Sequence, residues 1–451
     1  MWPLKTILYF ILFWVACIAA LFNPIWGVIN YMIVYQVNPQ DTWWGRPLAA
    51  MGMRFSMLAA VFVFLGLFIG RKRVPKLRPV LSPWELGLLA LVAMGAVSLV
   101  IGHNYNNTWS QYAFEKLWKM LVFVFILGRL ATTRRNLKLA LWALVVGSLH
   151  LGYEAYTAPA VAFWQGRLES VGGTDFSRTS GTAAHLAAML PLIGTVFLVA
   201  RQWKWQALAA ISGALSVNAI ALCRTRSAFV GLACGALAAV LTVPRVRRYR
   251  IHLLLCVGGV LAFTLTDNQF WHRMGTLTDR EVLATDPAAS GRFQVWAASL
   301  KIIVDHPQGV GIGNFPHTIG LYDPRHLRRS AHNTLVVCIT ELGIHSGVIF
   351  LLMVGGSFRC LHRSYKLADD TAYPLETKLL AYGLLVALTT YFVTALGTER
   401  FYCESFWWVL VLPLCLHRVV TREVAANAKV PELARIHEAE ENRGFFAPAV
   451  P

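Results

Sequence analysis

The chain has 451 residues, of which 56% are hydrophobic and only 14% charged, and its formal net charge is +18. Soluble proteins carry about 25% charged residues, so the composition excludes an ordinary soluble domain and predicts a protein that lies mostly in a membrane. The basic residues form short clusters between apolar runs, a pattern that orients membrane proteins and does not favour binding of nucleic acid.

Apolar runs long enough for a membrane helix, about 17 to 25 residues, follow one another along almost the whole chain. The first run, residues 4–37, is interrupted at Asn23-Pro24 and is either one kinked span or a tight pair of helices. Further runs begin near Met53, Pro83, Leu117, Leu137, Thr182, Trp205, Ala228, Ile251, Thr334, Leu379 and Phe401. We therefore predict an all-α fold, a polytopic transmembrane helical bundle of about 12 spans.

Lys and Arg in the short loops assign one face of this bundle to the cytoplasm. The clusters lie in residues 71–83, 132–138, 201–204 and 245–250, and two predicted spans separate each cluster from the next. The other loops then face outward, and the longest, 267–331, forms a large periplasmic loop between spans. Residues 1–451 are thus expected to form a single membrane domain, with a cytoplasmic tail at 419–451.

The long loop contains a predicted amphipathic helix, which Ser290 can cap. Its apolar positions recur at helical spacing: Phe293, Trp296, Ala297, Leu300, Ile303 and Val304. Such a stripe suits a helix in the interface plane or a packed surface helix. Arg292 falls in the first turn, where free backbone N–H groups favour anions. The following segment, Gly309-Val310-Gly311-Ile312-Gly313-Asn314, predicts a tight turn more than a phosphate loop.

Arginine, and not lysine, supplies most of the positive charge of the outward loops. The long loop has one lysine, Lys301. The outward arginines include Arg178, Arg224, Arg226, Arg273, Arg280, Arg292, Arg325, Arg328, Arg329 and Arg400. A guanidinium group binds phosphate at two points, whereas an ammonium group is a point charge. The set therefore predicts a site for a phosphate-bearing anion, with the alternative that each arginine snorkels or pairs with an acid such as Asp323.

His332 and Asn333 open the span that follows the long loop, directly after its last arginines. A histidine at a helix mouth is commonly only an interfacial residue, but next to an anion site it is a candidate general base. Asn333 can cap the helix or contact the ligand. Deeper in the same span, Glu341 and His345 share a helical face and are either functional or a mutually satisfied pair.

These features, taken in order, make the chain resemble the O-antigen ligase and polymerase superfamily. The resemblance rests on Arg178 in SRTSGTAAHLAAML, Thr225-Arg226-Ser227, Ser290-Gly291-Arg292 followed by Trp296, the GVGIGNF turn, and SAHNTLVVCITELGIHSG. The opening segments NPIWG, VNPQDTWWG and RKRVPKLRP are similar to O-glycosylation ligases associated with exosortase systems. The chain departs from many members at Ala184-His185, where those members have Asn-Pro-Asn.

The resemblance implies a membrane glycosyltransferase that moves a polysaccharide from undecaprenyl pyrophosphate to an acceptor hydroxyl on lipid A core, with inversion and without a metal. It implies His332 as the general base, Arg226 and Arg292 as the main pyrophosphate contacts, and Arg178 as a further contact. Arg224, Arg325, Arg328, Arg329 and Asn333 complete the predicted substrate-binding set. The expected location is the bacterial inner membrane, with the active site facing the periplasm.

The expected partners are the lipid-linked glycan donor, the lipid A core acceptor and membrane lipids, without nucleic acid. We expect no cofactor and no metal site, because no outward loop has a D-x-D motif. The nearest approach, Asp279-Arg280-Glu281, is interpreted as a structural acidic pair.

Three alternatives remain open from the sequence. An O-antigen polymerase shares the donor and differs in the acceptor, and a protein O-glycosylation ligase is a third member of the same superfamily. A transporter of lipid-linked sugars is less favoured, because the arginines gather at one face and no internal repeat is evident.

Overall fold

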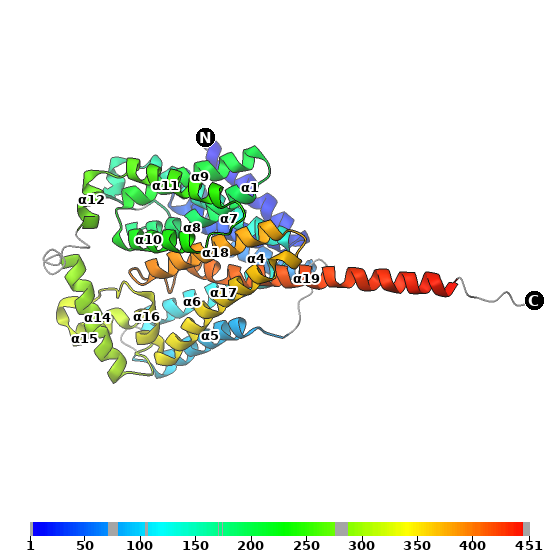
Figure 1. The fold of residues 1–451 in the computed structure, drawn as a ribbon. Helices are drawn as coiled ribbons and strands as arrows, with labels where there is room; N and C mark the ends of the chain where they lie inside the picture. The colour runs from blue at the N-terminus through cyan, green and yellow to red at the C-terminus, as the bar shows by residue number, and fades with distance from the viewer. Residues whose placement is uncertain are drawn as a thin grey trace, which may run out of the picture.

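The computed structural model describes residues 3–70, 80–103, 107–169, 171–173, 175–275 and 287–444. Regular structure in this part is almost entirely helical, and Figure 1 shows most of the long helices running side by side across the molecule. The helices of the first half are α1 (Leu4–Phe22), α2 (Ile25–Val37), α3 (Arg46–Ala50), α4 (Phe55–Ile69), α5 (Pro83–Ile101), α6 (Asn107–Leu130), α7 (Arg134–Tyr156), α8 (Thr179–Val199) and α9 (Trp203–Cys223).

The helices of the second half are α10 (Arg226–Leu241), α11 (Arg248–Leu265), α12 (Asn268–Gly275), α14 (Pro287–Asp305), α15 (Phe315–Tyr322), α16 (Thr334–Leu342), α17 (Ile344–Lys366), α18 (Pro374–Ala395) and α19 (Glu404–Gly444). Between α7 and α8, the strands β1 (Phe163–Trp164) and β2 (Arg167–Leu168) form a small antiparallel hairpin. Short 3-10 turns lie at Pro39–Asp41, Ala160–Ala162, Pro324–His326 and Ala368–Asp370.

Seven of the described helices are long and apolar enough to cross a membrane, namely α1, α5, α8, α9, α11, α17 and α18. The apolar helices α4 and α10 are shorter, and α6 and α7 have 24 and 23 residues without falling in this class. The all-α membrane fold expected from the composition is thereby confirmed. The number of spans, about 12, stays a prediction.

Residues 4–37 form a tight pair of helices and not one kinked span. Asn30 Nδ2 of α2 donates a hydrogen bond of 3.2 Å to Phe13 O of α1. Thr6, near the start of α1, donates to Trp44 O, which lies beyond the end of α2. Because the start of α1 meets the chain after α2, the two helices run antiparallel.

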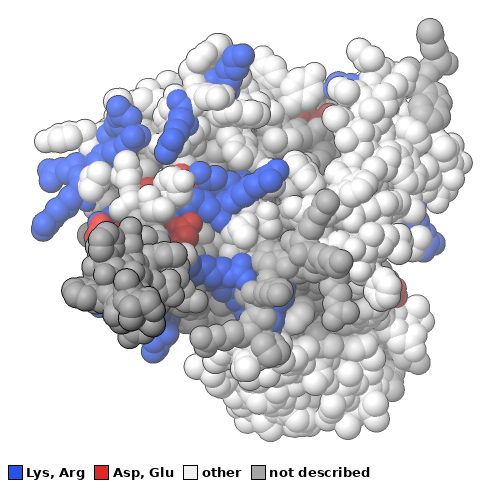
Figure 2. Space-filling model, turned by 90° about the vertical axis from the view of Figure 1, so that its right-hand side faces the viewer, with Lys and Arg blue, Asp and Glu red and all other residues white. Residues whose placement is uncertain are grey.

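The loops rich in Lys and Arg lie together at one end of the bundle. Arg134, the first residue of α7, forms salt bridges with Glu376 of α18 at 3.0 Å and Glu423 of α19 at 2.5 Å. Arg247, before α11, donates to the last turn of α8 at 3.2 Å. Figure 2 shows Lys and Arg gathered on this end, and Figure 1 shows α14, α15 and α16 at the opposite one. Most of the cluster 71–83 lies outside the described residues, and the assignment of this face to the cytoplasm stays a prediction.

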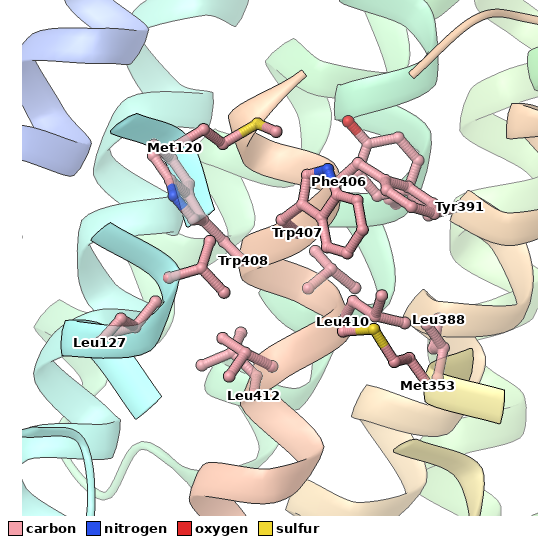
Figure 3. Close-up of a cluster of buried hydrophobic side chains, with 14 of the residues drawn as sticks. Met120, Leu127, Met353, Leu388, Tyr391, Phe406, Trp407, Trp408, Leu410 and Leu412 are labelled. Carbon is pink, nitrogen blue, oxygen red and sulfur yellow. The ribbon is translucent and has the colours of Figure 1, made fainter. Parts of the chain in front are cut away.

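The first half of α19 forms the centre of the bundle. Trp407 and Trp408 are both 0% exposed, and Figure 3 shows them packed among side chains of α6, α17 and α18. Trp407 Nε1 donates to Phe401 O at 2.8 Å, so its polar atom is satisfied. Lipid is as apolar as these side chains, so close packing of this kind is what holds helices together in a bilayer.

The predicted tail, 419–451, begins inside α19. The helix continues without a break to Gly444 and projects from the bundle as a long arm (Figure 1). No change of backbone conformation therefore marks the expected boundary at residue 419, and the division of the chain into a membrane domain, a loop and a tail stays a prediction.

Candidate functional site

An open cleft at the end of the bundle that carries α14, α15 and α16 is the candidate active site. It encloses about 230 Å³ and is built by three segments that are far apart in the sequence. Its lining residues are Asp175, Arg178 and Ser180 at the start of α8, Ser330 and His332 before α16, and Thr398, Glu399, Arg400, Tyr402 and Cys403 between α18 and α19. Two of the predicted site residues, His332 and Arg178, thus meet in one cleft.

The backbone around His332 fixes the position of its ring. The φ angle of His332 is +49°, in the left-handed region that few residues other than glycine adopt. Ser330 Oγ accepts a hydrogen bond of 3.2 Å from His332 N and donates to Glu399. Ala331 O accepts a bond of 2.8 Å from Trp296 Nε1. Because Trp296 belongs to α14, the helix of the long loop helps to place the histidine.

Burial and positive charge together lower the pKa of His332 from 6.5 to about 4. Burial is the largest cause, followed in order by the guanidinium groups of Arg292, Arg178, Arg400 and Arg329. At neutral pH the imidazole is therefore uncharged and can accept a proton. The same positive field favours an anion beside it.

Two helices begin at the cleft and add partial positive charge to it. Arg178 directly precedes α8, which has 21 residues, and Ser180 in its first turn lines the cleft. Asn333 caps α16, because its Oδ1 accepts from Leu335 N at 3.0 Å and from Val336 N at 3.1 Å. Helix N-termini favour anions. The predicted cap is confirmed, and the side-chain oxygen of Asn333 serves the helix instead of a ligand.

Arg226 lies beside the cleft as the first residue of α10. Its neighbour Ser227 forms a hydrogen bond of 2.8 Å with Thr398 Oγ1, and Thr398 lines the cleft. The Nε atom of Arg226 donates to Arg273 O at 3.4 Å. The start of α10 therefore abuts the cleft wall, although Arg226 is not itself a lining residue.

Arg292 and Arg329 come from two segments that face each other near His332. A Cβ atom on Gly291 would lie 2.9 Å from a terminal guanidinium nitrogen of Arg329, so the side chain of Arg329 crosses the first turns of α14. Helix α14 begins at Pro287, and Ser290 therefore lies inside the helix and does not cap it. The side chain of Ser290 and the segment Asp279-Arg280-Glu281 lie outside the described residues.

Arg178 is the one predicted substrate-binding arginine that lines the described cleft, and three of the others have side chains directed elsewhere or exposed. Arg224 binds the carboxylate of Asp267, and Arg325, 73% exposed, binds Asp323 at 2.8 Å and lowers the pKa of that carboxyl to about 2. Arg328 is exposed, with a left-handed backbone at φ +61°. For Arg224 and Arg325, the alternative of pairing with an acidic neighbour is the one that the structure shows.

The wall between α18 and α19 contributes residues outside the predicted substrate-binding set, and one of them, Arg400, was counted only among the outward arginines. Arg400 N donates to Thr334 Oγ1 at 2.8 Å, and its guanidinium group donates to Asp175 O at 3.3 Å. Arg400 therefore joins the starts of α8, α16 and α19. A charged pair, Glu399-Arg400, at the outer end of an apolar run was the available signal in the sequence.

The carboxylate of Asp175 is neutralised from below the cleft. Lys116 Nζ of α6 binds Asp175 Oδ1 at 2.6 Å, and Tyr35 OH of α2 donates to Asp175 Oδ2. The negative charge of Asp175 is thus already compensated. Glu399, the other carboxylate of the lining, accepts a hydrogen bond from Ser330.

Glu341 ties the glycine-rich turn to the cleft. Its carboxylate accepts from Gly313 N at 2.9 Å, from Phe315 N at 3.3 Å and from Tyr402 OH. The segment from Gly309 to Asn314 is the predicted tight turn, with Gly313 at φ +74°. Glu341 is therefore satisfied by the turn and the cleft wall, and its expected pairing with His345 is not what the structure shows.

Comparison with known proteins agrees with this geometry. Residues 211–351 match a family model described as O-antigen ligase, and this stretch includes Arg226, Arg292 and His332. No curated protein matches the chain. The resemblance expected from the motifs is confirmed over the matched stretch. The matched stretch runs from within α9 to within α17, and this similarity supports a membrane enzyme of the O-antigen ligase or polymerase type.

Proposed function

We propose that the protein is a glycosyltransferase of the inner membrane that joins a polysaccharide, carried on undecaprenyl pyrophosphate, to an acceptor hydroxyl on lipid A core at the periplasmic face. The observation that carries this proposal is the uncharged His332 among guanidinium groups in a cleft. A sugar transfer from a lipid pyrophosphate needs a base for the acceptor and positive charge for the leaving group. The cleft offers both.

The arginines hold the pyrophosphate of the donor. The charges of Arg178 and Arg292 both act on His332, and Arg226 opens α10 beside the cleft wall. Each preorganised donor aimed at the charge that develops on the leaving group contributes about 3 kcal/mol. Once its charge is held, a pyrophosphate leaves without a strong general acid.

His332 removes the proton of the acceptor hydroxyl. As the hydroxyl oxygen forms a bond to the anomeric carbon, the bond between that carbon and the phosphate oxygen breaks. The electron pair of the broken bond stays with the lipid pyrophosphate, and the proton stays on the imidazole until solvent removes it. A single displacement of this kind inverts the anomeric configuration, and a positioned base accelerates it roughly 100-fold or more.

Donor binding strengthens the base. The guanidinium groups lower the pKa of free His332, and a bound diphosphate offsets their charge, so the pKa of His332 rises when the donor is present. The imidazole is thus a better proton acceptor in the loaded cleft than in the empty one. The acceptor hydroxyl is deprotonated only where a leaving group is ready.

The direct test is reconstitution of the purified protein with an undecaprenyl-pyrophosphate-linked glycan and a lipid A core acceptor, with EDTA present. We expect transfer by the native protein in EDTA and loss of transfer in His332→Ala. The matched control is His345→Ala, because His345 is an exposed histidine on α17. Full activity of His332→Ala in a folded protein would reject the base assignment.

The products distinguish the other members of the superfamily. Lengthening of the lipid-linked glycan without transfer to lipid A core identifies a polymerase, and transfer to a polypeptide hydroxyl identifies a protein O-glycosylation ligase. Cells that lack a ligase accumulate lipid-linked polymer, whereas cells that lack a polymerase keep single repeat units. Movement of labelled lipid-linked glycan across vesicles without transfer would identify a transporter.

A further inference from the structure

We propose a second anion site at the end of the bundle opposite the cleft, which binds the phosphate headgroup of an anionic membrane lipid. A cavity of about 440 Å³ lies there between the end of α8 and the starts of α9, α11 and α18. Its lining includes Arg201 from the loop between α8 and α9, Arg247 directly before α11, and Arg250 in the first turn of α11. This volume is in the range of small-molecule sites, and the inference does not depend on the proposed transfer reaction.

The cavity keeps a net positive charge although a carboxylate lines it. Glu376 is the acidic residue of the lining, and Arg134 and Lys138 bind its two oxygens at 3.0 and 2.7 Å. These two partners come from α7 and are not themselves lining residues. The charge of Glu376 is thus balanced from outside the cavity, and the three arginines of the lining are not compensated by it.

The backbone around the cavity also favours an anion. Helices α9, α11 and α18 begin there, and helix N-termini carry partial positive charge. The opposing contribution comes from the C-terminal carbonyls of α8. Arg247 donates to Leu198 O at 3.2 Å, and Gln206 Nε2 donates to Ala200 O at 2.9 Å, so these carbonyls are occupied.

The surroundings of the cavity indicate a lipid as the source of the phosphate. After its basic first turn, α11 exposes a row of large apolar side chains: Leu253, Val257, Val260 and Phe263. Trp203 and Trp205 are exposed at the start of α9, and exposed tryptophans at helix ends are typical of a membrane interface. A lipid can therefore lay its acyl chains along α11 while its phosphate enters the cavity, a placement known for basic pockets between membrane helices.

The test compares lipid binding by three forms of the full-length protein in detergent, measured by native mass spectrometry and by the thermal unfolding midpoint. The probes are dioleoyl phosphatidylglycerol and dioleoyl phosphatidylcholine. The site variant combines Arg201→Gln, Arg247→Gln and Arg250→Gln. The matched control combines Arg359→Gln, Arg363→Gln and Lys366→Gln, which remove the same charge from exposed positions on α17 outside the cavity.

We expect phosphatidylglycerol to bind the native protein and the control equally and to raise their unfolding midpoints, with phosphatidylcholine much weaker. The site variant should bind phosphatidylglycerol about 100-fold more weakly, and Arg250→Gln alone about fivefold more weakly. The midpoints without lipid show that each variant is folded. The single variant keeps the test valid if the triple variant does not fold.

Two results would overturn the assignment. Equal binding of phosphatidylglycerol by the site variant and the control would show that the cavity is not the site. Protection of the native protein by inorganic phosphate without lipid, lost in the site variant, would assign the cavity to a soluble phosphate compound and refute the lipid.

Discussion

At the end of the bundle opposite the cleft, Glu85, 1% exposed, binds Arg129 at 2.5 Å and Arg418 at 2.8 Å. Arg134 similarly binds two carboxylates. At the cleft end, by contrast, the charges of Arg178, Arg292 and Arg329 act on His332. Neither Arg178 nor Arg329 forms a salt bridge with a described carboxylate. The same residue type thus fastens helices at one end and surrounds a histidine with positive charge at the other, and the difference lies in where the acidic partners are.

The sharpest test of this contrast is replacement of His332. Both His332→Ala and His332→Asn should lower kcat/KM about 1000-fold, because neither side chain accepts the proton. Asparagine adopts the left-handed backbone readily, so the unfolding midpoint of His332→Asn should stay near that of the native protein. A folded His332→Asn variant that keeps more than about a tenth of the native kcat/KM would contradict the assignment of His332 as the base.

Replacement of the arginines that act on His332 should lower kcat/KM much more than replacement of an exposed arginine elsewhere. Arg178→Gln and Arg292→Gln should each lower kcat/KM about 100-fold, because each removes one charged donor for the pyrophosphate. The control is Arg325→Gln, which changes a 73% exposed side chain paired with Asp323 and should alter the rate less than about twofold. Equal losses in all three variants would mean that general surface charge, and not the cleft, binds the donor.

At the end of the bundle opposite the cleft, replacement of the buried carboxylate of Glu85 should lower stability and leave the rate of transfer unchanged. Glu85→Gln should lower the free energy of unfolding by about 2 kcal/mol, because it leaves two guanidinium groups without their counter-charge. The thermal midpoint in detergent measures the loss, and the initial rate of transfer at low temperature should match that of the native protein. A variant with native stability and reduced transfer would reverse the roles assigned to the two ends.

The pH dependence tests the charge around His332 directly. His332 has a pKa of about 4 in the protein without bound donor. As the pH is lowered, kcat/KM should therefore stay level to about pH 4 and then fall tenfold for each further pH unit. The unfolded chain binds this proton more readily than the folded protein between pH 6.5 and 4, so stability should also fall in that window. Arg292→Gln should move the acid limb to higher pH. If kcat/KM of the native protein instead began to fall near pH 6.5, the arginines would not act on His332.

The sequence predicted the helices well where the signal was local. The run expected from Pro83 is α5, which starts at Pro83, and the run expected from Trp205 is α9, which starts at Trp203. A long apolar window is a property of consecutive residues, so no tertiary information is needed to find it. Whether residues 4–37 form one kinked span or a pair of helices could not be decided from the sequence, because it depends on contacts between α1 and α2.

Glycine spacing shows where local patterns stop being informative. Gly231-Gly235 and Gly343-Gly347 have the same spacing, which is typical of packed helices. A Cβ on Gly235 would lie 2.0 Å from Thr390 Oγ1 of α18, so this glycine does permit helix packing. Gly343, at φ +89°, instead separates α16 from α17, and a Cβ there would lie 2.6 Å from Gln308 O. Only the fold distinguishes these two uses.

The candidate site was predicted in part for the same reason. The sequence singled out His332 and Arg178, which the structure brings to one cleft, because their residue types and their places at helix mouths carry chemical information. The partnership of Lys116 with Asp175 and the bridging role of Arg400 were missed. They join segments that are far apart in the chain, and only packing brings those segments together.

Glu341 couples the glycine-rich turn to the wall of the cleft. One carboxyl group holds the backbone of the glycine turn and the hydroxyl of Tyr402, so movement of either segment strips a buried polar group of a partner, which is costly. The two sides of the opening are therefore coupled, and small fluctuations of one rim are resisted by the other. Separation of these two segments therefore requires both to give up hydrogen bonds to the same side chain.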